Sequence, residues 1–82
     1  MDLTHPLLKE FPEHREAIRW LRGSDESFRH MFDEYHQVDE AVYRIEEEID
    51  YATDQEIEEL KWKRAKLKDA LYHALRRAPA LH

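Results

Sequence analysis

Histidine and carboxylate side chains with the spacing of metal ligands occur within one short stretch of the sequence. His30, Asp33, Glu34 and His36 fall within two turns of an expected helix, and imidazole and carboxylate groups bind many divalent metals. A metal site in a helical bundle, however, needs a matching set of ligands on another helix, and the sequence offers no second copy of this motif. We therefore predict no metal site and assign these side chains to the solvated surface.

A second group of side chains, Asp69, Tyr72 and His73, could serve acid–base chemistry. Such chemistry usually requires a buried group with a shifted pKa, beside a pocket that holds a reacting partner. With one Gly and no Cys, the chain has neither a glycine-rich phosphate loop nor a thiol nucleophile. We therefore predict that the protein is not an enzyme and uses no cofactor.

Residues 61–69 read KWKRAKLKD, a basic run in a chain whose net charge is -6. Basic residues that bind nucleic acid gather on one face, whereas those of this run surround a helix at about 100° per residue. Residues 31–60 hold twelve acids and one Arg, and residues 61–82 hold seven Lys or Arg and one Asp. We predict that the run neutralises the chain's own acidic helix, with nucleic-acid association through the basic C-terminal half as the alternative function.

Helices are the elements that must position these groups, because 39% of the 82 residues are charged and only one is Gly. The expected elements are an arm and three helices, at residues 1–11, 12–22, 25–51 and 54–77. Pro12 suits the start of the first helix and Gly23 its end. Thr53 and Glu56 have the spacing of a capping box at the start of the last helix.

Apolar residues repeat every seven positions through both long helices. In the first of them the two seam positions hold Phe28, Tyr35, Val42 and Ile49, and Met31, Val38, Ile45 and Ala52. In the second they hold Ile57, Arg64, Leu71 and Ala78, and Leu60, Leu67 and Ala74. A short connection makes such helices antiparallel neighbours. The predicted fold is a single all-α domain, a long antiparallel helical hairpin resembling a coiled coil, with the short N-terminal helix packed at its open end.

Folding the chain back near Ala52 predicts which side chains meet along the hairpin. The facing levels are Ile49 with Ile57, Glu46 with Lys61, Asp39 with Lys68, and Phe32 with Leu75. Arg64 is the polar residue on the seam, and we expect its guanidinium to reach out to Glu46 or Asp39. The residues predicted to specify the hairpin are therefore Asp39, Glu46, Lys61, Arg64 and Lys68.

Three stretches carry a family resemblance: FPEHREAIRWLR, FRHMFDEYHQVDEAVYRIE and EIEELKWKRAKLKDAL. They resemble the YdcH-like family of small bacterial proteins of unknown function, over about residues 11–75. Two features depart from the family pattern: Ala70 stands where an acid often follows Asp69, and the connection between the long helices is short. The resemblance implies a helical hairpin in a bacterial cytoplasm, and it brings no activity, substrate or catalytic residue.

Large aromatic side chains on polar helix faces are candidates for contact with a partner. The candidates are Trp62, Tyr43, Trp20 and Phe11, and Tyr51 is a further large aromatic residue of this kind. The open end of the hairpin also carries more apolar surface than two helices can cover. Either the short helix or a second copy of the chain covers it, and the two do not exclude each other. We favour the short helix, with a homodimer as a further expectation.

These observations predict a small non-catalytic adaptor that binds a protein partner or itself. No stretch approaches the roughly 20 apolar residues of a membrane span. The N-terminus also lacks the order of residues found in a signal peptide. We therefore expect a cytoplasmic protein that does not bind membranes.

Overall fold

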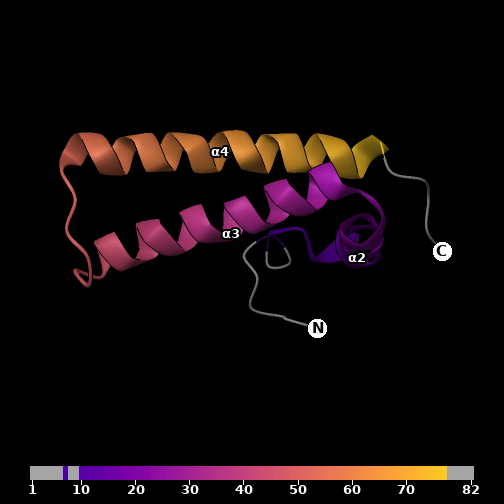
Figure 1. Cartoon of the computed structure of the whole chain (residues 1–82), viewed down its shortest axis with the longest axis horizontal. Coiled ribbons are helices and arrows are strands. Elements are labelled where there is room, and N and C mark those ends of the chain that lie inside the picture. Colours follow the sequence, from indigo (N-terminus) through magenta and orange to yellow (C-terminus); the bar gives the residue numbers. More distant parts are fainter. Residues whose placement is uncertain (1–6, 8–9, 78–82) are drawn as a thin grey trace.

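A computed structural model describes Leu7 and residues 10–77 of the chain. Its elements, in chain order, are η1 (Pro12–His14), α2 (Arg15–Ser24), α3 (Glu26–Glu46) and α4 (Asp54–Arg77). The regular elements of this described part are all helical, which confirms the all-α prediction. The two long helices, α3 and α4, form an antiparallel hairpin, and α2 crosses it at the open end (Figure 1).

The long helices pack through the apolar stripes that their seven-residue repeat predicts. The buried members of the stripes are Phe28, Tyr35, Val38 and Val42 on α3 and Leu71 on α4. On α4, Ile57, Leu60 and Leu67 are only half-buried. Toward the connection each helix has only the other to cover it, so burial is most complete at the open end, where a third element packs.

Helix α2 covers the open end of the hairpin. Its Ile18 and Leu21 are 2% and 6% exposed. They belong to one core cluster with Phe28, Phe32 and Leu75. The sequence leaves two possible covers for the open end, the short helix or a second copy of the chain. Within a single chain, the short helix covers it.

Leu7 is part of the same core and has no exposed surface. From the sequence it falls in the arm over residues 1–11, because the apolar residues there follow no clear period. Leu7 and Glu10 are helical, and the Phe11 N–H donates to the Leu7 carbonyl at 3.0 Å. Residues 1–6, 8 and 9 of the predicted arm lie outside the described residues.

The first helix differs from its predicted range of 12–22. A 3₁₀ turn comes first, at Pro12–His14, and the α-helix runs from Arg15 to Ser24 with Gly23 inside it. The helical backbone is interrupted at Asp25, which has extended backbone angles (φ -126°, ψ 109°). Its carboxylate caps α3 by accepting the Phe28 N–H at 3.1 Å. This capping bond favours a helix start at Glu26 and so sets the boundary, rather than the glycine.

The second helix ends at Glu46, short of the predicted end at residue 51. Its C-terminus is a Schellman motif. The Ile49 N–H donates to the Arg44 carbonyl at 2.8 Å, and the Glu48 N–H donates to the Ile45 carbonyl at 3.0 Å. Glu48 takes the left-handed conformation that such a motif requires, with φ 60°.

The turn that follows removes Ile49 from the seam. The Arg44 Nε donates to Asp50 Oδ2 at 2.7 Å, which closes the turn and lowers the pKa of Asp50. Ile49 is 56% exposed, so the predicted layer of Ile49 with Ile57 is wrong. In the sequence, the seven-residue repeat continues through residues 47–53. In the structure, these residues form the turn between the two long helices and are not helical.

Helix α4 begins with the capping box that the sequence predicts. The Glu56 N–H donates to Thr53 Oγ1 at 3.1 Å, and the Thr53 N–H donates to Glu56 Oε1 at 3.0 Å. The two bonds satisfy donors that a helix start leaves without helical partners. Hydrogen bonding to the Glu56 carboxylate lowers its pKa, chiefly from the backbone N–H of Thr53 and next from the Thr53 side chain.

Replacing Glu48 by glycine is expected to stabilise the protein by about 1 kcal/mol. A left-handed conformation costs an L-residue roughly 1–2 kcal/mol, and the greater freedom of glycine in the unfolded chain offsets part of this gain. Glu47→Gly is the matched control, because Glu47 has φ -87° and should lose stability. Urea unfolding measures both variants, and a Glu48→Gly protein no more stable than Glu47→Gly would contradict the assignment.

Acid should weaken the capping box. Because the folded-state pKa of Glu56 lies below its ordinary value of 4.5, its contribution to stability is present above pH 4.5 and is lost as the pH falls through the folded-state pKa. Glu56→Gln keeps an acceptor for the Thr53 N–H without this titration. We expect its thermal midpoint to be close to that of the parent at neutral pH and to fall less in acid. Equal losses for the two proteins would argue against the capping role.

Candidate functional site

Arg64 is the polar residue in the apolar stripe of α4. Its Nη1 donates to Asp39 Oδ1 on α3 at 3.0 Å. The two side chains are 32% and 34% exposed, so the pair lies at the edge of the seam and keeps contact with water. Asp39 is one of the two acids toward which the sequence predicts Arg64 to reach. The charge thus leaves the seam while Arg64 stays in its register position.

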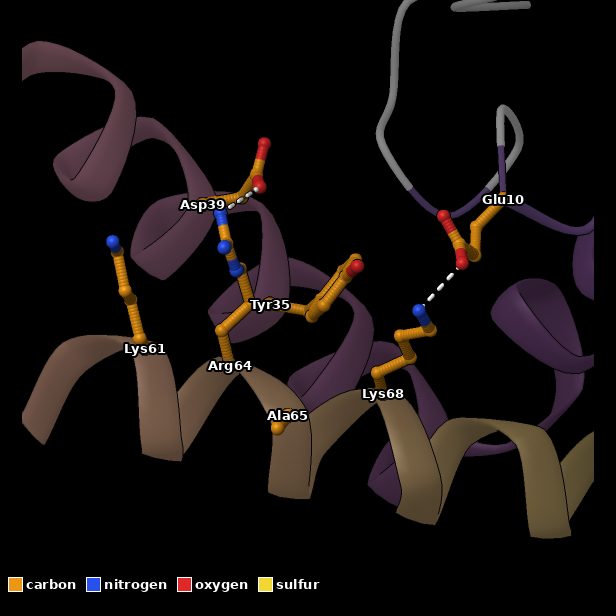
Figure 2. Close-up of a pocket in the computed structure, with 7 residues that line it drawn as sticks. All are labelled: Glu10, Tyr35, Asp39, Lys61, Arg64, Ala65 and Lys68. Atoms are coloured by element: carbon orange, nitrogen blue, oxygen red, sulfur yellow. Dashed lines mark hydrogen bonds and ion pairs between the residues drawn. The ribbon is translucent and has the colours of Figure 1, made fainter. Parts of the chain in front are cut away.

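A groove of about 440 Å³ lies beside this pair, between α3, α4 and the segment that contains Glu10 (Figure 2). Its lining residues are Glu10, Tyr35, Asp39, Lys61, Arg64, Ala65 and Lys68. Figure 2 shows Arg64 and Lys68 directed to different acids, the first to Asp39 and the second to Glu10. The third base of the lining, Lys61, pairs with Glu46 outside the groove, so each of its charged side chains has a partner in an ion pair.

The predicted pairing of Asp39 with Lys68 is wrong, although both side chains line this groove. Arg64 holds Asp39, and Lys68 Nζ contacts Glu10 Oε1 instead. A guanidinium presents several fixed donors to a carboxylate, which favours Arg over Lys where both can reach. The position of Glu10 depends on how the N-terminal segment packs, so it could not be predicted from the repeat of the long helices.

Tyr35 forms the buried wall of the groove and is 4% exposed. Burial raises the pKa of its phenol, the negative charges of Asp39 and Glu10 add to the rise, and Arg64 opposes it. The phenol therefore stays protonated at neutral pH, where it can donate and accept hydrogen bonds but is a poor base. The groove can recognise polar groups by hydrogen bonding and by exchange of its ion pairs.

The other members of the basic run also contact groups of their own chain. Lys61 Nζ lies 3.4 Å from Glu46 Oε2, the pair predicted from the sequence, and Lys63 Nζ lies 2.9 Å from Glu34 Oε2. Lys66 Nζ lies 4.6 Å from the centre of the Trp62 ring, within cation–π range. With Arg64 and Lys68, each of the five basic residues of the run has a partner within the chain.

The ion pairs between α3 and α4 have their acids on α3 and their bases on α4. The pairs are Glu34 with Lys63, Asp39 with Arg64, and Glu46 with Lys61. Exposed pairs of this kind contribute only about 0.2–1 kcal/mol each. They therefore act mainly on which way the helices pair, as the charge distribution of the sequence suggests.

The side chains considered for metal binding are spread along α3. His30 faces Glu26 at 3.8 Å and His36 faces Glu40 at 3.8 Å, each one turn away on the same helix. Within residues 7 and 10–77, no three His, Cys, Asp or Glu side chains are placed to hold a metal ion.

The group considered for acid–base chemistry lies near the end of α4. His73 Nε2 is 3.5 Å from Asp69 Oδ1, and both side chains are more than half exposed. Tyr72 stacks on Phe11, with ring centres 5.2 Å apart, and its ring centre lies 6.3 Å from that of His73. None of the three side chains lines the groove beside Arg64.

The predicted interaction residues divide into two kinds. Trp20, Tyr43 and Trp62 are 45%, 57% and 64% exposed. Phe11 is half-buried and packs against the core, so it fixes the N-terminal segment to α4 through Tyr72. Tyr51, which the sequence groups with these exposed aromatic residues, is 94% exposed in the connection between α3 and α4.

Comparison with known proteins gives one match. A family model described as "Protein of unknown function (DUF465)" matches residues 28–75, more than half of the chain. No curated protein and no solved structure matches the chain. The matched range runs from the first buried residue of α3 to the last of α4, so it coincides with the hairpin. None of the helices in the described residues has the length and apolar character needed to cross a membrane.

Replacing Arg64 by leucine is expected to leave the thermal midpoint unchanged or to raise it. Leucine gains apolar contact on the seam, while the ion pair that it removes is one-third exposed and contributes at most about 1 kcal/mol. Asp39→Ala is the control, since it removes the same pair without the apolar gain, and it should melt slightly below the parent. An Arg64→Leu protein that melts well below the parent would show that the pair stabilises the fold.

Proposed function

The chain belongs to the DUF465 family, which includes the YdcH-like proteins, and we propose that it is a small non-catalytic adaptor that binds a protein partner. The observation that carries this proposal is the exposure of Trp62 and Tyr43 on the hairpin, at 64% and 57%. Indole and phenol side chains are enriched where proteins bind each other, because they combine large apolar area with a polar group.

The surroundings of Trp62 support its role as an anchor. It lies in the middle of α4 between Lys61 and Lys63, both of which face acids of α3. The ammonium of Lys66 lies over its ring, which restrains the side chain before any partner arrives. An anchor that is already ordered loses less conformational entropy on binding.

Self-association is the second part of the proposal. A hairpin with one apolar stripe per helix has little core for its length, so a second copy of the chain that adds buried apolar area would stabilise it. We propose that the chain also forms a homodimer, and that it acts in the cytoplasm. The lack of a catalytic role is supported by the groove, whose charged side chains are engaged in ion pairs and whose phenol is protonated.

Nucleic-acid binding has weaker support. Lys61, Lys63, Arg64 and Lys68 face carboxylates of the same chain. A phosphate backbone would have to compete with these acids for each contact. We therefore do not propose a nucleic-acid partner.

Trp62→Ala should strongly weaken binding of a partner while leaving the fold intact. Crosslinking and affinity capture from the native cells, with the tagged chain as bait, identify the partner, and titration with that purified partner measures affinity. We expect a loss of about 30-fold or more, as for an interface anchor. Gln37→Ala, another exposed position of the hairpin, is the control and should bind as the parent does. Equal capture by all three proteins would refute the role of Trp62.

A further inference from the structure

A single residue, Asp25, separates α2 from α3. It is extended (φ -126°, ψ 109°), whereas its two neighbours belong to helices. Helical hydrogen bonds nevertheless reach it from both sides. The Asp25 N–H donates to the Leu21 carbonyl at 2.8 Å, and the Arg29 N–H donates to the Asp25 carbonyl at 3.0 Å. Rotation of Asp25 alone into the helical region would therefore join α2 and α3 into one helix over residues 15–46.

The seven-residue repeat of α3 continues into α2 in the same register. Leu21 precedes Phe28 by seven residues, and Ile18 precedes Phe32 by fourteen. The residues that α2 directs to the core thus lie in line with those that α3 directs to it. A joined helix would carry one continuous apolar face, which requires a partner along its whole length.

The hairpin surface beneath α2 is apolar and belongs to the same core as Ile18 and Leu21. Phe28, Phe32, Leu71 and Leu75 are each at most 4% exposed with α2 in place. If α2 swings away with the joined helix, these side chains face water. The same segment from a second copy would pack against them in the same way and bury them again.

We propose that two copies of the chain form a dimer by exchanging the segment that contains Glu10 and α2. In this dimer Asp25 is helical, and α2 of each copy covers the open end of the other hairpin. The packing of α2 on its own hairpin is replaced by identical packing between the two chains. The equilibrium between monomer and dimer therefore depends on the conformation of Asp25, the hinge, in each of the two chains and on the entropy of association. The inference rests on the proposed self-association and is independent of partner binding through Trp62.

Charge favours the open ends as the surfaces that meet. Residues 46–59, at the closed end, contain eight acids and no Lys or Arg. Two closed ends brought together would therefore repel. The closed and open ends lie at opposite ends of the hairpin (Figure 1). Exchange at the open ends thus keeps the acidic ends of the two copies far apart.

Two hinge substitutions should shift this equilibrium in opposite directions, measured by sedimentation equilibrium. Asp25→Ala removes the cap on the Phe28 N–H. The dimer dissociation constant should fall about fivefold per hinge, or roughly 30-fold for two. Glu26→Pro should hold the chain as a monomer, because a residue before proline avoids the helical region and proline suits the first position of a helix. Asp25→Asn keeps a capping side chain and should behave as the parent.

Thiol crosslinking with a short bis-maleimide tests whether the segment itself is exchanged. Glu10 contacts Lys68 on the hairpin through two long side chains, and the chain has no native Cys. Cysteines at these two positions are too far apart for a direct disulfide. In a mixture of Glu10→Cys and Lys68→Cys chains, the bis-maleimide joins the two thiols when the segment of one chain packs on the hairpin of the other. We expect this product in the parent background, more of it with Asp25→Ala, and none with Glu26→Pro.

Two outcomes would overturn the exchange. Either the parent and Asp25→Ala stay monomeric up to the limit of solubility, or they dimerise without the Glu10→Cys to Lys68→Cys product. The second outcome would indicate association through an outer surface, which leaves the proposed adaptor function standing. Circular dichroism checks that the Glu26→Pro chain keeps its helices. If it does not, the comparison of Asp25→Ala with Asp25→Asn decides the question.

Discussion

Phe28, Phe32, Leu71 and Leu75 form an apolar surface at the open end of the hairpin that two helices cannot bury between themselves. Burying one large apolar side chain contributes about 1.5–3 kcal/mol, more than most exposed ion pairs. Cover for this surface therefore governs how the rest of the chain is arranged. Helix α2 and Leu7 supply that cover, and together with the hairpin they make one core.

Charge acts on a different property of the fold. The acids of α3 face the bases of α4, which favours the antiparallel pairing and disfavours pairing of like helices. The basic run is thus engaged mainly within the molecule. Lys68 on α4 forms an ion pair with Glu10 in the N-terminal segment. This pair ties the segment that leads into α2 to the hairpin.

Local hydrogen bonds decide where the helices begin and end. Asp25 and Thr53 cap helix starts, and Glu48 supplies the left-handed residue that ends α3. With these boundaries in place, the outer faces of the helices carry a few large aromatic side chains. This arrangement suits a protein that presents contacts to a partner more than one that builds a reactive pocket.

The sequence by itself determined the two long amphipathic helices, their antiparallel pairing, the capping box at Thr53 and the ion pair of Glu46 with Lys61. These features depend on residues within a few turns of one helix, or on a repeat that runs along both long helices, and such patterns are visible in the letters. Only the tertiary structure decided the place of Leu7, the choice of Glu10 by Lys68 and the departure of Ile49 from the seam. Each of these depends on where a crossing segment or a chain reversal lies in space, and no periodic pattern along the chain carries that information.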